Sequence, residues 1–254
     1  MSGLVAQLKG RLAEPADFSA VLAGSWTGLT AAELAGRTVN VVGRGAVPLG
    51  ELCTVTGKPD GTVRFTGDFR LAGRLGSGLT EGAVTVEGSV GDETGTGMAG
   101  GAIHILGDAG DGTAAAAADA RRGMTGGEVV VAGSVGEGAG GLMRRGLLAV
   151  GGGTGRHTGA GFIAGTIVVF GAVGPVPGLW SKRGSIVALG AVEIPSTYRY
   201  ACTYQPMHTR LILTRLEAIY GLPVGERHLS GFYRRYSGDL ADLGKGEILA
   251  WTAE

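Results

Sequence analysis

Short stretches of alternating apolar and polar residues recur along most of the chain. Each unit reads glycine, a small or polar residue, Val or Ile, any residue, an apolar residue, any residue, and a closing glycine. The alternating apolar pairs are Val84 and Val86, Ile103 and Ile105, Val129 and Val131, Leu148 and Val150, and Ile167 and Val169. Because successive side chains of a strand point to opposite faces, each unit predicts a short β-strand with an apolar face.

The units recur at a regular spacing. They begin at Gly36, Gly61, Gly82, Gly101, Gly127, Gly146, Gly165 and Gly184, and the commonest spacing between starts is 19 residues. One spacing is 26, and its excess lies at residues 113–119, TAAAAAD. Since the register resumes after this insertion, the pattern predicts a looped-out segment on a stack of equivalent coils.

Further glycines recur at fixed places after each strand. They lie nine residues after most starts, as at Gly91 and Gly174, and thirteen after several, as at Gly95 and Gly140. Glycine adopts positive φ without steric cost, so we expect these positions to be corners. The sequence therefore predicts an all-β fold, a parallel β-helix of about eight ~19-residue coils stacked about 4.8 Å apart.

One column of the repeat, sixteen residues after the starts, predicts part of the interior. It contains Met98, Met124, Met143 and Phe162, with Met124 counted back from the next start. Met fills gaps in irregular cores. We therefore expect these side chains to form an internal apolar stack and not a cofactor pocket.

The two ends depart from the repeat and are expected to close it. Residues 1–35 predict an N-terminal cap with an edge strand near residues 4–8. Residues 36–194 form the predicted β-helix, and residues 195–254 the C-terminal helix and capping segment. An open apolar end of a stack must be covered, so both caps have a structural role.

A helix is predicted at the start of the C-terminal segment. Met207, Leu211, Leu216 and Ile219 have helical spacing and precede Gly221. This pattern is typical of an amphipathic helix that ends at glycine. We expect these four residues to be its apolar face and the helix to cover the last coil as an α-helical cap.

Composition excludes several classes of protein. Glycine accounts for 51 of 254 residues, but only 8 are proline, which excludes collagen, and 44% hydrophobic residues argue against disorder. Lys and Arg balance Asp and Glu at 22 each, so no global field recruits nucleic acid or an anionic membrane.

Cys53 and Cys202 are far apart, and no apolar run approaches the ~18 residues of a membrane span. We expect a cytoplasmic protein without a disulfide framework.

The sequence contains no recognisable catalytic or metal-binding pattern. Neither glycine-flanked lysine, Lys58 or Lys245, has the remaining residues of a phosphate-binding loop. The histidines are scattered, at His104, His157, His208 and His228. No zinc-protease or serine-hydrolase motif occurs. The sequence therefore predicts no catalytic residue, no metal site and no cofactor of its own.

One surface feature suggests binding. Arg144 and Arg145 lie 17 and 18 residues after Gly127, and Lys182 and Arg183 lie at the same distances after Gly165. These columns coincide two coils apart, which predicts two basic pairs about 10 Å from each other. Such a stripe suits a polycarboxylate or an acidic partner surface. A solvated face with intrachain ion pairs would show the same pattern, so both interpretations stay open.

The repeat and the ending together resemble a known family. The coil G-x-[VI]-x-[VI]-x-G-x-x-G, the turn GGLMRRG and the closing stretch FYRRYSGDLADLGKGEILAW (Phe232 to Trp251) resemble the C subunit of formylmethanofuran dehydrogenase. The resemblance extends from about Gly36 to the end. The C-terminal domain of the glutamate synthase large subunit, of the GXGXG family, has a similar coil, and the closing stretch favours the first family.

The resemblance implies a right-handed β-helix subunit in a multisubunit complex that handles formyl groups on methanofuran-type carriers. Two versions of the complex exist, the archaeal metal-dependent dehydrogenase and the bacterial formyltransferase/hydrolase complex. The Arg-, Ala- and Gly-rich composition favours the bacterial version. In both, the amidohydrolase-like metal site and the formyltransferase site belong to other subunits.

The leading hypothesis is therefore a non-catalytic scaffold subunit. Its partners would be the formyltransferase and amidohydrolase-like subunits, which pass a formyl group from tetrahydromethanopterin to methylofuran and release formate. Arg144, Arg145, Lys182 and Arg183 would contact the polyglutamate tail of the carrier or an acidic partner. The alternatives are a glutamate-synthase-like spacer domain and a stand-alone β-helix enzyme acting on polysaccharide.

Overall fold

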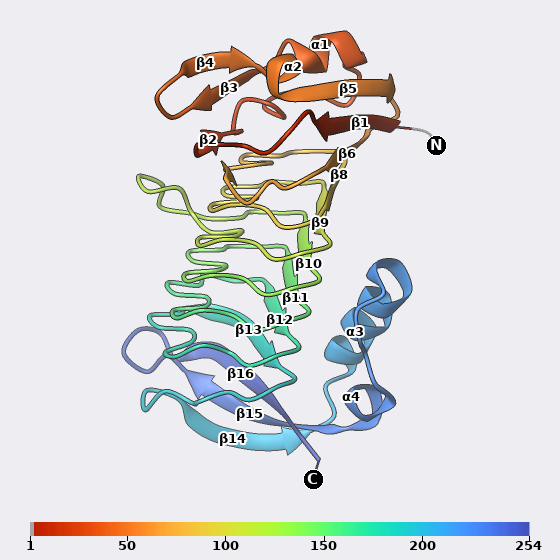
Figure 1. Cartoon of the computed structure of the whole chain (residues 1–254). Coiled ribbons are helices and arrows are strands. Elements are labelled where there is room, and N and C mark those ends of the chain that lie inside the picture. The colour runs from red at the N-terminus through yellow and green to blue at the C-terminus, as the bar shows by residue number, and fades with distance from the viewer. Residues whose placement is uncertain (1–2, 254) are drawn as a thin grey trace.

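The computed structural model describes residues 3–253 and consists mainly of two sheets (Figure 1). The larger sheet has twelve strands in the order β14-β15-β16-β13-β12-β11-β10-β9-β8-β6-β1-β5, and the smaller has four in the order β4-β3-β2-β7. Few residues are helical. The large sheet runs the length of the molecule (Figure 1).

The centre of the large sheet is a run of parallel strands. They are β6 (Thr62–Thr66), β8 (Ala83–Glu87), β9 (Ala102–Ile105), β10 (Glu128–Val131), β11 (Leu147–Val150), β12 (Thr166–Val169) and β13 (Arg183–Ala188). Equivalent positions of the repeat are partners, as Val84 is with Ile103. The alternating apolar pairs are all buried, so the predicted strands and their inward face are confirmed.

The N-terminal segment adds strands to both sheets. Strand β1 (Gly3–Leu8) lies between β6 and β5 (Cys53–Lys58), so the strand was predicted correctly but its edge position was wrong. The small sheet comprises β2 (Ala16–Asp17), β3 (Thr38–Val41), β4 (Gly45–Pro48) and β7 (Ala72–Gly73), with helices α1 (Ala31–Ala35) and α2 (Leu49–Leu52) nearby. The unit that begins at Gly36 enters this small sheet and not the parallel run.

The C-terminal segment closes the other end with antiparallel strands. Strand β16 (Lys245–Thr252) continues the parallel run beside β13, and β15 (Phe232–Gly238) and β14 (Arg199–Tyr204) follow antiparallel. Helices α3 (Met207–Tyr220) and α4 (Glu226–Ser230) lie to one side of the sheet (Figure 1).

The predicted right-handed parallel β-helix with a C-terminal α-helical cap is wrong. The continuous ladders form one mixed sheet with antiparallel pairs at both ends, plus the small sheet, and the last unit is followed by strands. Among residues 3–253, the turn segments that connect the parallel strands are hydrogen-bonded to one another, as Glu93 is to Asp111, but their β-pairing consists of isolated bridges, such as Phe69 with Val90. Positive φ at recurrent glycines such as Gly140 interrupts extended backbone there, so a second ladder cannot develop.

Helix α3 is present, but its buried face differs from the predicted one. Gly221 ends it in the left-handed conformation, as expected. Leu213 and Leu216 are buried, whereas Met207 and Leu211 are each 66% exposed. The helix packs sideways on the outer face of the sheet, where its leucines contact a buried apolar column of Val130, Ala149, Val168 and Val187.

The recurrent glycines fall into two physical classes. Those thirteen residues after the starts have positive φ, for example +68° at Gly95 and +67° at Gly140, which confirms them as corners. Nine residues after the starts, five glycines do not have positive φ: Gly91, Gly110, Gly136, Gly155 and Gly174. A Cβ at one of these, Gly174, would lie 2.2 Å from the carbonyl oxygen of Gly155. At these positions glycine permits close approach of neighbouring turns.

The predicted interior column is confirmed. Met98, Met124, Met143 and Phe162 are at most 1% exposed and belong to the main apolar core. The insertion loops out where expected, although Thr113, Ala114 and Ala115 at its start are still buried. The exposed part is about residues 118–122. The core thus remains continuous through the irregular unit.

Candidate interaction surface

The four predicted basic residues come together around one shallow hollow. Its volume is about 360 Å³, and its lining is Arg144, Arg145, Ile163, Ala164, Lys182, Arg183 and Leu243. The two basic pairs flank the apolar Ile163 and Ala164 of the intervening unit. We call Arg144, Arg145, Lys182 and Arg183 the basic stripe.

The buried column holds the basic stripe in place. The carbonyl oxygen of Met124 accepts the N–H of Arg144 at 2.8 Å, and that of Phe162 accepts the N–H of Lys182 at 2.7 Å. Between them, the carbonyl oxygen of Met143 accepts the N–H of Ile163 at 2.8 Å. Each turn is thus hydrogen-bonded to a residue whose side chain lies in the core. The 19-residue repeat therefore sets both the burial of the column and the spacing of the cations.

The cations of the stripe are weakly compensated. Lys182 has a long ion pair to Asp242, at 3.9 Å. Within residues 3–253, Arg144, Arg145 and Arg183 have no ion pair. The interpretation of the stripe as a face of intrachain ion pairs therefore loses most of its support, and three guanidinium groups remain available to an external anion.

Charge is segregated along the stack. Residues 138–192 contain five Lys or Arg residues and no Asp or Glu, whereas residues 81–137 contain nine Asp or Glu and only two Arg. A net charge of zero conceals this separation. The basic stripe therefore lies in a positive region, which favours acidic ligands or surfaces locally.

A loop from the far end of the sequence forms one side of the hollow. Residues 239–244 connect β15 to β16 and bring Leu243 to the stripe. The buried Asp239 accepts the backbone N–H of Trp180 at 2.8 Å and that of Ala241 at 2.9 Å. Burial opposes the charge of this carboxyl group, but hydrogen bonds from Ala241, Trp180 and Thr197 keep its pKa below the usual value. Asp239 thus fixes the loop against the turn that carries Lys182.

Sequence reasoning missed this loop and its apolar residues. Trp180, Leu240 and Leu243 are 61%, 55% and 52% exposed. A signal existed for Trp180, which lies two periods after Leu142 in the same corner column. Both adopt positive φ, +55° at Leu142 and +56° at Trp180, in spite of their side chains. No pattern in the sequence indicated that residues 239–244 would lie beside them.

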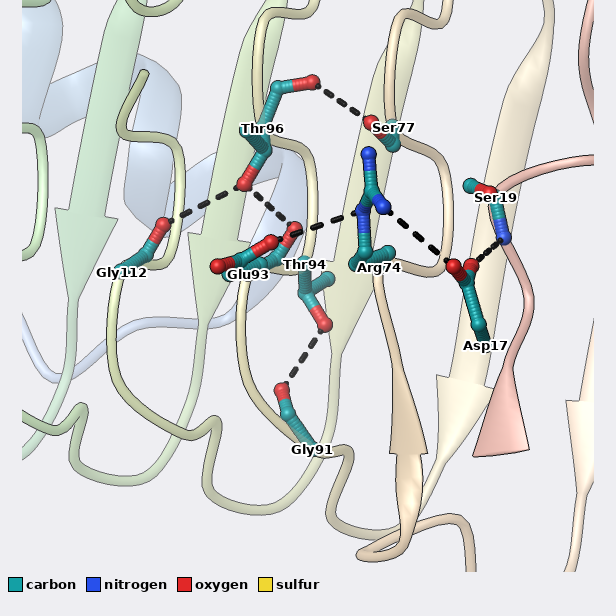
Figure 2. A network of polar contacts seen from close by, with 9 residues as sticks. All are labelled: Asp17, Ser19, Arg74, Ser77, Gly91, Glu93, Thr94, Thr96 and Gly112. Atoms are coloured by element: carbon teal, nitrogen blue, oxygen red, sulfur yellow. Dashed lines mark hydrogen bonds and ion pairs between the residues drawn. The ribbon is translucent and has the colours of Figure 1, made fainter. Parts of the chain in front are cut away.

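A second polar cluster joins the N-terminal segment to the stack (Figure 2). Arg74 lies between Asp17 of β2 and Glu93, with ion-pair distances of 3.3 and 3.4 Å. Thr94 and Thr96 donate to backbone carbonyl oxygens of their own turn. A mixed-charge hollow of about 470 Å³ lies beside this cluster, with Asp17 and Arg74 in its lining. These contacts account for the cluster as a structural link.

A third cluster fastens α3 to the sheet. Glu128 of β10 accepts hydrogen bonds from Arg215, at 2.9 Å, and from the hydroxyl group of Tyr220. The ring of Tyr220 meets that of His104 edge to face, with centroids 4.9 Å apart. Burial lowers the pKa of His104. His104 thus points away from the main core and packs against the helix.

The described residues meet the requirements neither of a metal site nor of a membrane-spanning helix. Among residues 3–253, no three His, Cys, Asp or Glu side chains are grouped so that they could hold a metal ion. In the same part of the chain, no helix has the length and apolar character needed to span a membrane.

Comparison with known proteins supplies an independent result. No protein-family model matches the chain, and no curated protein does. Among solved structures, it is similar to a chain in the crystal structure of the formyltransferase/hydrolase complex (FhcABCD) from Methylorubrum extorquens in complex with methylofuran. The TM-score is 0.78 and the sequence identity 32%, over 97% of this chain and 98% of that chain. The chain therefore belongs to the same family as that component of the formyltransferase/hydrolase complex.

Proposed function

We propose that the chain is the C subunit of a formyltransferase/hydrolase complex and acts there as a non-catalytic scaffold. The observation that supports this most directly is the 32% identity over nearly the full length of both chains. The resemblance of the closing stretch, residues 232–251, to the C subunit of formylmethanofuran dehydrogenase favours this component among those of the complex. The complex would transfer a formyl group from tetrahydromethanopterin to methylofuran and release it as formate.

The scaffold would join the formyltransferase and amidohydrolase-like subunits. The shape supports this role, since one long sheet presents successive turns as a fixed surface along its length (Figure 1). A rigid array of equivalent turns suits a chain that must hold several partners at set distances. The carrier methylofuran would be bound by the complex.

Purification of the tagged chain from its own cells tests the assignment. We expect formyltransferase and amidohydrolase-like subunits to co-purify in fixed stoichiometry, as identified by mass spectrometry. A chain that remains monomeric and brings neither partner would contradict the proposal.

The basic stripe is proposed as the contact for an anionic group, either the polyglutamate tail of methylofuran or an acidic partner surface. Reversal of charge in an Arg144→Glu, Lys182→Glu double variant should weaken carrier retention or assembly, more strongly at low salt because exposed charges are screened. Lys58→Glu, an exposed cation on the distant strand β5, is the matched control. Equal retention of carrier and partners by the double variant and the control would refute this contact.

A further inference from the structure

An exposed tryptophan lies beside the basic stripe, two residues before Lys182. Trp180 is 61% exposed and adopts φ +56°, a conformation that costs a residue with a Cβ about 1 kcal/mol or more. An exposed Trp is also unfavourable for a protein that remains free in water. The positive φ recurs at Leu142 in the same corner column and so belongs to the fold, whereas the exposure of the indole indicates a side chain that is used by contact with something else.

The backbone around Trp180 is firmly held. Its N–H donates to the buried carboxylate of Asp239, and the neighbouring Ser181 is hydrogen-bonded through its hydroxyl group to Tyr198 at 2.6 Å. Tyr198 in turn donates to the carbonyl oxygen of Gly178 at 3.0 Å. The indole therefore projects from a preorganised turn, which lowers the entropy cost of binding through it.

Two further apolar side chains come from the loop that Asp239 anchors. Leu240 and Leu243 are more than half exposed, and Leu243 lines the hollow of the basic stripe. We call Trp180, Leu240 and Leu243 the Trp180 patch. Apolar groups rimmed by Arg and Lys, with a Trp among them, have the composition of a protein interface.

We propose that the Trp180 patch and the basic stripe together form a docking surface for an acidic protein segment that carries an apolar anchor residue. This rests on the proposed function, since the segment would belong to another subunit of the complex. The absence of any Asp or Glu from residues 138–192 supplies the charge complementarity for an acidic segment. A polyglutamate tail would use the cations but would gain nothing from three exposed apolar side chains.

The first test compares assembly of purified complexes. Trp180→Ala keeps the Cβ and so leaves the backbone strain unchanged, while it removes the indole. We expect at least about a tenfold loss of affinity for the partner subunit, as for a central interface Trp. Leu243→Ser should act in the same direction and is a second variant in case Trp180→Ala fails to fold. Leu211→Ala, at a position of similar exposure on α3, is the control and should assemble like the parent.

The second test is photo-crosslinking within the purified complex. A photoreactive amino acid at position 180 should form a crosslink to one peptide of another subunit, and that peptide should contain both carboxylates and a large apolar residue. Crosslinking to a second copy of this chain, to methylofuran or to a peptide without carboxylates would overturn the proposal.

The outcomes separate the two proposals. If the parent chain brings no partner subunit, the proposed function fails. If the parent assembles but Trp180→Ala and Leu243→Ser assemble equally well, the proposed function stands and the docking surface is wrong.

Discussion

Replacement of Gly174 by alanine tests the claim that part of the glycine content serves close packing of turns. In Gly174→Ala, the new Cβ would lie 2.2 Å from the carbonyl oxygen and 2.4 Å from the carbonyl carbon of Gly155, whereas 3.4 to 4 Å is ordinary contact. Both atoms belong to backbone, so the two turns must separate by about 1 Å. Overpacking costs about 1–3 kcal/mol. The weakening of hydrogen bonds such as that from Thr154 to Ala172 adds about 1 kcal/mol each. We expect a loss of about 3 kcal/mol of unfolding free energy.

Gly138→Ala is the matched comparison. Gly138 has φ +67°, but nothing lies within 4 Å of its ideal Cβ position. The left-handed conformation costs alanine about 1–2 kcal/mol, and the lower entropy of the unfolded chain offsets about 0.4–1 kcal/mol. The net loss should therefore be about 1 kcal/mol.

Urea unfolding of the two purified variants and the parent chain, followed by circular dichroism, measures these losses from the midpoints at constant m-value. The reasoning is refuted if Gly174→Ala is no less stable than Gly138→Ala, because the steric term would then be absent. An altered m-value in Gly174→Ala alone would instead indicate that the turn has unfolded locally.

Three further predictions concern buried or half-buried groups. Met143 is fully buried, so Met143→Ala should lose about 2–4 kcal/mol of unfolding free energy, which urea midpoints measure. The carbonyl oxygen of Met143 accepts the N–H of Ile163, so the same variant should also loosen that turn, which hydrogen exchange measures. His104 has a lowered pKa, so its folded form favours the neutral ring; stability should be full above about pH 6.5 and fall as the pH decreases below it. A His104→Phe variant should show a flatter profile of urea midpoint against pH. Burial raises the pKa of Cys53 to about 12, whereas Cys202 is exposed; alkylation of the native chain followed by mass spectrometry should label only Cys202.

The parallel strands could be predicted because one local pattern decides each of them. Alternation within a unit identifies the inward face, and a fixed period places Ile103 beside Val84 without knowledge of the rest of the chain. The Met column followed from the same period. Because the same pattern recurs every 19 residues, the central sheet and the basic stripe can both be predicted from the sequence.

The position of the C-terminal helix was mispredicted, because it depends on contacts between the repeat and the irregular C-terminal segment. For α3, the spacing of Met207 and Leu211 identified a helix but not its buried face. The useful signal was in the strands instead, since β10 to β13 carry an outward apolar residue such as Val130 or Val168, where a strand that faces water would have a polar one. This column required a cover on the side of the sheet and not at its end.

The loop at residues 239–244 shows a different limit. Its contact with Trp180 spans 59 residues and includes a hydrogen bond to Asp239, which no periodicity encodes. Such contacts arise only when the sheet brings β16 beside β13. The apolar half of the proposed docking surface could therefore not be predicted, although its basic half could.

The repeat also explains how one architecture can separate structural from recognition positions. Inward columns must remain apolar in every unit, whereas a column such as the one that carries Arg145 and Arg183, each just before the start of a unit, faces water and can change one unit at a time. Each change alters the surface in steps of about 4.8 Å along the sheet. In this chain, the inward column is occupied continuously from Met98 to Phe162, while the outer charge changes from acidic to basic near residue 138. The charge of the turns therefore distinguishes one part of the stack from another, and a charged partner would bind preferentially at one of them. The core that sets the spacing of the turns is the same in both parts.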